Sequence, residues 1–160
     1  MLKPMTSTRL GSLCIVLAGL IFAPYAVADD EADVRAVVQQ YGALENDLDA
    51  QAKLMRDDRV FILGGIRRTD EAKNMAIQKA SRAAGEAANG GKTKFITTIT
   101  GTVVAIYGDV AVASFVRVFN VFPHNKPAIQ GASNWVTLVL VKERGKWGIA
   151  HTHNSPYGGN

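Results

Sequence analysis

The sequence predicts an α+β fold in which helices precede a mostly antiparallel β-sheet. Across much of residues 30–90, apolar residues recur at steps of three and four, the spacing of one helix face. From residue 94 onward, β-branched and aromatic residues form runs separated by short turns that contain Gly or Asp, the pattern of consecutive antiparallel strands. Helices followed by a strand meander are typical of the α+β class.

The first half carries three helix signals and one strand signal. A helix is expected over residues 30–44, behind an acidic first turn that suits a helix N-terminus. A second, short helix is expected to start at Asp47, a typical N-cap residue. A short strand at residues 60–63 precedes a third helix, which Thr69 should cap and Asn89-Gly90-Gly91 should end. We expect its alanine stripe to lie against whatever the helix covers: Ala72, Ala76, Ala80, Ala83 and Ala87.

The strands of the second half are apolar on both faces. In residues 110–122, alternation points Val116 and Val118 to one face and Phe115 and Phe119 to the other. Helices can cover one face and enclose a cavity there. The other face would remain a large exposed apolar surface unless a partner covered it. We therefore predict a homodimer that forms through the sheet.

Residues 1–28 have the features of a secretory signal peptide. Lys3 and Arg9 precede an apolar run, and Ala26-Val27-Ala28 supplies an A-x-A cleavage site before acidic residues. A membrane span needs about 20 apolar residues, and this run is shorter. We expect cleavage after Ala28 and a periplasmic or secreted location. Residues 29–160 should then form one domain with no membrane contact.

Removal of this leader changes the charge and the cysteine content. The whole chain has 18 Lys and Arg residues, 14 Asp and Glu residues and a formal net charge of +4, but Lys3 and Arg9 lie in the leader. The remainder therefore carries +2, which gives no compositional support for nucleic-acid binding. The single cysteine, Cys14, also lies in the leader, so no disulfide is expected in the domain. Because Cys14 follows Leu13 and not a small residue, we expect no lipid anchor.

Two stretches of the second half resemble a known family. "TTITGTVVAIYGDVAVASFVRVFNVF" and "RGKWGIAHTHNS" are similar to the association (hub) domain of calcium/calmodulin-dependent kinase II and its bacterial SnoaL-like relatives. The resemblance covers residues 93–156 and implies the nuclear-transport-factor-2-like (NTF2-like) superfamily, with a cone-shaped, cystatin-like fold of helices on a curved sheet. Because that superfamily includes isomerases, dehydratases, cyclases and non-catalytic binding domains, function has to be argued from the site.

The resemblance and the strand pattern give a candidate ligand-binding site. Arg117 lies inside an apolar strand, where a charge is costly to bury unless it is paired, and it matches a pocket arginine of the family pattern. The pattern also implies pocket-facing positions for Asn134 and Asn154, the latter in place of an arginine. Thr152 shares the face of Asn154 by alternation. We expect these four residues to bind a small molecule that carries a carboxylate.

The pair His151 and His153 is open to three interpretations. Alternation predicts that both share one strand face with Trp147 and Ile149. An H-x-H pair can bind zinc if further ligands converge, but no spacing in this chain selects them. A general acid or base would need an orienting carboxylate. The third interpretation is a strand or dimer-interface role. We expect no metal and no cofactor.

The alternative function is a cofactor-independent lyase, isomerase or cyclase in the same cavity. The stretch "RDDRVFILGG" is similar to the ketosteroid-isomerase segment that leads to the catalytic aspartate, but the matching position falls at Leu63, which cannot abstract a proton. Asp47, Asp49 or a histidine would have to replace it, so the catalytic residues are left unassigned. Arg117 also has an alternative role: in place of binding a ligand, it would form a structural salt bridge to a helix carboxylate such as Glu45 or Asp47.

Overall fold

The computed structural model describes residues 23–158 and confirms the α+β class. Its helical elements are α1 (Ala23–Ala43), the 3₁₀ turn η1 (Leu44–Asn46), α2 (Leu48–Ala52) and α3 (Glu71–Asn89). Its strands are β1 (Met55–Leu63), β2 (Ile66–Arg68), β3 (Lys94–Tyr107), β4 (Val110–Phe122), β5 (Ile129–Glu143) and β6 (Lys146–Pro156). The strands form a six-stranded sheet in the order β2-β1-β6-β5-β4-β3. The β1–β6 pair is parallel, and the other neighbours are antiparallel.

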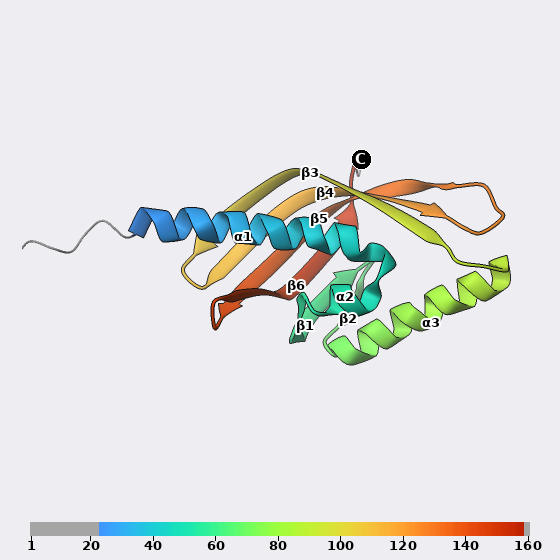
Figure 1. Cartoon of the computed structure of the whole chain (residues 1–160), viewed down its shortest axis with the longest axis horizontal. Coiled ribbons are helices and arrows are strands. Elements are labelled where there is room, and N and C mark those ends of the chain that lie inside the picture. The colour runs from blue at the N-terminus through green and yellow to red at the C-terminus, as the bar shows by residue number, and fades with distance from the viewer. Residues whose placement is uncertain (1–22, 159–160) are drawn as a thin grey trace, which may run out of the picture.

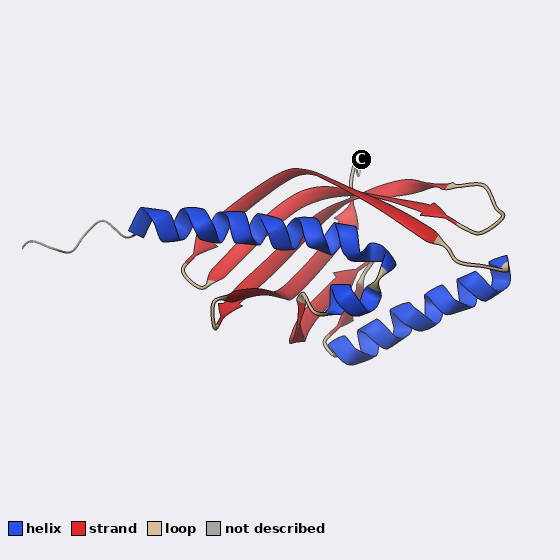
Figure 2. Ribbon diagram, in the orientation of Figure 1, coloured by secondary structure: helices blue, strands red, loops and turns tan. Residues whose placement is uncertain are grey.

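The helices cover one face of the strongly twisted sheet (Figures 1 and 2). The long helix α1 lies across the sheet and contacts β3, β4 and β6, whereas α3 packs beside β1. Figure 1 shows α1 and α3 diverging, with α2 between them near the β1–β2 hairpin. The core lies mainly under α1 and consists of Val34, Val38, Tyr41, Ala111, Ala113, Phe115, Val136, Leu138, Leu140, Trp147 and Ile149. The space under α3 is therefore left for a cavity.

Local capping signals set two of the helix boundaries as the sequence predicts. Asp47 caps α2, because its carboxylate accepts a hydrogen bond from the backbone N–H of Ala50 at 2.9 Å. Gly90 ends α3 with a φ of 74°, a left-handed conformation that glycine adopts without strain. The expected cap of α3 is wrong by one residue, since Asp70 and not Thr69 accepts from the backbone N–H of Lys73.

The alanine stripe of α3 does not face the sheet. Ala72, Ala76, Ala80, Ala83 and Ala87 are all exposed. The face that α3 turns inward is mainly polar, and Met75 and Ile77 are its larger apolar residues. Its polar residues are Glu71, Asn74, Gln78, Ser81 and Arg82. The prediction of an alanine contact face is therefore wrong. Small residues satisfy helix propensity at any position, so their period does not tell which side of a helix is buried.

A β-bulge in β6 overturns the predicted faces of the closing strand. His151 pairs with Val139 and Ile149 pairs with Leu140, so two steps along β6 match one step along β5 and Ala150 is the extra residue. Because one extra residue reverses the alternation, Trp147 and Ile149 lie on the same covered face as Thr152 and Asn154. The two histidines lie on the opposite face, where His151 is half-buried and His153 is exposed.

The sheet face without helices is rich in apolar residues. Ile96, Val103, Tyr107, Val110 and Trp135 are exposed there, beside half-buried valines of β4 and β5.

Among the described residues, no helix is long and apolar enough to cross a membrane. Residues 1–22 of the predicted leader lie outside the described range, and the predicted cleavage point after Ala28 falls within α1.

Candidate functional site

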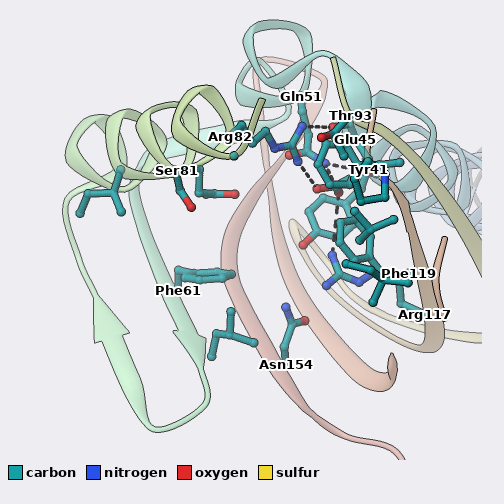
Figure 3. A pocket seen from close by; sticks show the side chains of 18 of the residues that line it. Tyr41, Glu45, Gln51, Phe61, Ser81, Arg82, Thr93, Arg117, Phe119 and Asn154 are labelled. Carbon is teal, nitrogen blue, oxygen red and sulfur yellow. Dashed lines mark hydrogen bonds and ion pairs between the residues drawn. The ribbon is translucent and has the colours of Figure 1, made fainter. Parts of the chain in front are cut away.

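A cavity of about 470 Å³ lies between α3 and the covered face of the sheet. Its volume falls within the range of small-molecule sites, about 300–1,000 Å³. Figure 3 shows Ser81 projecting from α3 toward Phe61, Arg82 reaching Glu45, and Asn154 and Arg117 pointing into the cavity from the strands. The apolar lining is mainly aromatic and aliphatic: Tyr41, Phe61, Leu63, Ile77, Phe95, Phe119, Val121 and Ile129.

Arg117 lies in this cavity, as the sequence predicts, and it is weakly paired. Its side chain is 12% exposed, and its guanidinium lies over the Phe119 ring, 5.1 Å from the ring centroid. The nearest carboxylate contact is 3.9 Å, from Nη1 to Glu45 Oε2, which is too long for a hydrogen bond. The buried Nε has no hydrogen-bond partner among the described residues. Arg117 is thus a desolvated cation with unused donors.

Glu45 is held more closely by other groups than by Arg117. Arg82 Nη2 contacts Glu45 Oε1 at 2.5 Å, and Arg82 Nη1 donates to the backbone carbonyl of Glu45. Gln51 Nε2 donates to Glu45 Oε2 at 3.0 Å and to the Tyr41 carbonyl at 2.7 Å. Arg82 also lies over the Phe95 ring at 4.3 Å. The alternative in which Arg117 forms a structural ion pair with a helix carboxylate is therefore only partly supported, because its contact with Glu45 is 3.9 Å long.

The other three predicted site residues have different surroundings. Asn154 lines the cavity, is 3% exposed and has a buried Oδ1 without a partner in the described structure. Thr152 is fully buried behind the lining, with Oγ1 3.4 Å from Arg59 Nη1. Asn134 is the cross-strand partner of Arg117, yet its Nδ2 donates to the Ala132 carbonyl at 3.3 Å and it does not line the cavity. Their binding roles stay predictions.

A buried ion pair, absent from the sequence predictions, anchors the start of α3. Arg59 Nε donates to Glu71 Oε2 at 2.8 Å, and both side chains are almost completely buried. Asn74 Nδ2 lies 3.4 Å from the same oxygen, and Arg68 Nη1 donates to Asn74 Oδ1 at 3.0 Å. Burial raises the pKa of the Glu71 carboxyl, an effect that the charge of Arg59 partly offsets. This network fixes Arg59 and Arg68 at the wall opposite Arg117.

The predicted catalytic groups do not reach the cavity. His151 and His153 lie on the other sheet face, where burial, and secondarily the charge of His153, lowers the pKa of His151. Asp47 caps α2, and Asp49 is exposed and pairs with Lys79. His151, His153, Asp47 and Asp49 are therefore not placed to act on a molecule in this cavity. No group of three or more His, Cys, Asp or Glu side chains within the described part of the chain is placed to hold a metal.

Solved structures with the same fold agree with this architecture. An NTF2-like protein with a cystatin-like fold from Novosphingobium aromaticivorans is 17% identical with a TM-score of 0.70, over 86% of this chain and 88% of that chain. A candidate dehydratase of the NTF2-like family from Streptomyces avermitilis is 14% identical with a TM-score of 0.67, over 83% and 99%. An NTF2-like protein from Pseudomonas putida is 17% identical with a TM-score of 0.63, over 80% and 87%. These likenesses show the fold alone.

Sequence comparison places the chain more narrowly. Among curated proteins, none matches the sequence. The family model of the calcium/calmodulin dependent protein kinase II association domain matches residues 73–158, which is more than half of the chain and includes most of α3 and all of β3 to β6. This match confirms the resemblance drawn from the two C-terminal stretches. The chain therefore belongs to the calcium/calmodulin dependent protein kinase II association domain family, within the NTF2-like superfamily.

Proposed function

We propose that this chain is an exported protein that binds a small, carboxylate-bearing molecule in the cavity under α3. The observation that carries the proposal is Arg117, a buried guanidinium at the cavity wall whose Nε has no partner and whose nearest carboxylate is 3.9 Å away. Burying a cation without a full partner costs free energy. A ligand carboxylate would recover that cost by a paired, charge-assisted hydrogen bond.

Two further features of the cavity support binding of an organic acid. Phe119 and Phe95 stack at 5.4 Å beside Arg117 and form an apolar wall for the ligand's carbon skeleton. The unpartnered Oδ1 of Asn154 adds an acceptor for a hydroxyl or amide donor on the ligand. A mostly apolar cavity with a few convergent polar groups is the usual form of a small-molecule site.

Binding fits the site better than catalysis. A general base needs a carboxylate or imidazole free to take a proton from the ligand. Among the described residues that line the cavity, Glu45 is the acidic one, and Arg82 and Gln51 hold both of its oxygens. An isomerase or dehydratase reaction would need Glu45 released from Arg82.

The first test is the loss of ligand binding on Arg117→Gln. Thermal shift across a panel of organic acids should show stabilisation of the wild type and none of the variant, because the amide cannot replace the guanidinium fork. Arg67→Gln is the matched control, since Arg67 is exposed on the neighbouring hairpin and should leave the shift unchanged. If no acid stabilises the wild type, or if Arg117→Gln binds acids equally well, the proposal fails.

We also propose that two copies associate through the sheet face that carries no helices. The exposed apolar residues of this face support the proposal, because contiguous apolar surface on a soluble protein usually marks an interface. The matching family is named for association, and that supports oligomerisation in general.

Export is proposed from the leader sequence alone. Intact-mass measurement of the protein recovered from the periplasm or the medium should show a chain that starts at Asp29, because the A-x-A site ends at Ala28. The same measurement on Ala28→Arg should show uncleaved precursor, since the cleavage site requires a small residue. A mature wild-type chain that retains residues 1–28 would contradict the proposal.

A further inference from the structure

We propose that the ligand of this cavity is a dianion, held at one end by Arg117 and at the other by Arg68. This inference rests on the proposed function and specifies its ligand class. The reason is an excess of positive charge in the cavity lining, combined with the placement of two arginines on separate walls.

The lining holds more guanidinium groups than carboxylates. Four arginines line the cavity, whereas Glu45 is the acidic residue among the described lining side chains. Each of two arginines has a close carboxylate partner: Arg82 contacts Glu45 at 2.5 Å and Arg59 contacts Glu71 at 2.8 Å. Because those two pairs are neutral overall, about two positive charges remain in the cavity. They belong to Arg117 and Arg68.

Arg68 is positioned like a binding residue and lacks a counter-ion. It is the register partner of Phe61, so it shares the covered sheet face with that lining residue. Its Nη1 donates to Oδ1 of Asn74, which is 1% exposed and is itself held by Glu71. The amide fixes the guanidinium without neutralising it. No salt bridge to Arg68 forms within residues 23–158.

The sheet order separates the two arginines and places apolar surface between them. Arg68 lies on β2 and Arg117 on β4, with β1, β6 and β5 between them. The register row of Arg68 crosses β4 at Ala113, four residues from Arg117. Four strand spacings of about 4.8 Å and this offset of about 13 Å along β4 put their backbones roughly 23 Å apart on a flat sheet, and the twist and the two long side chains shorten the gap. Phe61 and Leu63 of β1 line the space between. A ligand that reaches both arginines thus carries an anionic group at each end of an apolar middle.

Calorimetric titration with three matched series of linear acids tests this inference. At neutral pH and fixed ionic strength, α,ω-dicarboxylates of four to ten carbons are compared with monocarboxylates and ω-amino carboxylates of equal length. At least one dicarboxylate should bind about tenfold or more tightly than its monocarboxylate, which corresponds to about 1.4 kcal/mol. The ω-amino acids should bind most weakly, because their ammonium group would face Arg68.

Variants at position 68 assign the effect to that residue. Arg68→Gln should abolish the dicarboxylate preference and leave monocarboxylate affinity within about twofold, because Arg117 still holds one carboxylate. Arg68→Lys keeps the charge without the planar fork and should retain part of the preference. Arg67→Gln, on the same strand but exposed, should behave as wild type.

The outcomes separate this inference from the proposed function. Equal affinity of the wild type for dicarboxylates and monocarboxylates would overturn the dianion inference while single-carboxylate binding at Arg117 stands. An Arg68→Gln variant that keeps the preference would overturn it as well. If neither acid series binds the wild type, the proposed function itself fails. The wild-type comparison decides the question even if Arg68→Gln does not fold.

Discussion

Glu71→Ala should lower the free energy of unfolding by about 3–5 kcal/mol, because it leaves a buried guanidinium without its counter-ion. Arg59 is 2% exposed and Glu71 6% exposed, so water cannot replace the lost 2.8 Å contact. The same pair joins α3 to β1, and α3 buries few apolar side chains of its own. Urea unfolding followed by circular dichroism, with a check that the m-value is unchanged, measures the effect.

Two control variants test whether the lost stability comes from the unpaired charge of Arg59 and not from the shortened side chain at position 71. The double variant Arg59→Met, Glu71→Leu removes both charges and should recover most of the stability, since a buried ion pair contributes little more than an apolar pair of similar size. Asp49→Ala breaks the exposed pair between Asp49 of α2 and Lys79 of α3 and should cost within about 1 kcal/mol. A Glu71→Ala variant as stable as the wild type would show that Arg59 is solvated or paired elsewhere.

Val139→Glu should convert the proposed dimer to a monomer. Val139 is half-buried near the centre of the uncovered sheet face, between Val112 of β4 and His151 of β6. Two-fold symmetry would bury the new carboxylate twice in an apolar interface, and each unpaired charge costs several kcal/mol. The dissociation constant should therefore rise at least about 100-fold. Sedimentation velocity at micromolar concentration, with circular dichroism to confirm folding, measures the change.

The matched control places the same charge where no contact is proposed. Ala84 is exposed on α3, on the other side of the molecule, so Ala84→Glu should leave the sedimentation coefficient unchanged. A wild type that sediments as a monomer at these concentrations would exclude the dimer. If Val139→Glu still forms a dimer, the interface lies on another surface of the protein.

The sequence alone determined the features of the chain that arise from local interactions. Capping requires only a carboxylate three residues before a free N–H, so Asp47 predicts the start of α2. Only glycine enters the left-handed region without strain, so Gly90 predicts the end of α3. Alternation in β4 places Phe115 and Arg117 on one shared face because no bulge interrupts that part of the strand, and the family resemblance implies that this face lines the cavity. The α+β class follows from such short-range rules, whereas the choice of Arg117 also needed the family resemblance.

The tertiary structure decided what depends on contacts between distant segments. The bulge at Ala150 reverses the face of His151 and His153, and it arises from pairing with β5, which alternation in one strand cannot reveal. The partners Arg82 and Glu45 lie 37 residues apart. Arg68 forms no salt bridge within residues 23–158, since its partner is the amide of Asn74 and the nearby Glu71 pairs with Arg59. A sequence does not show which charged residues pair in the fold, so only the tertiary structure reveals that Arg59 and Arg82 have close carboxylate partners and that Arg68 has none.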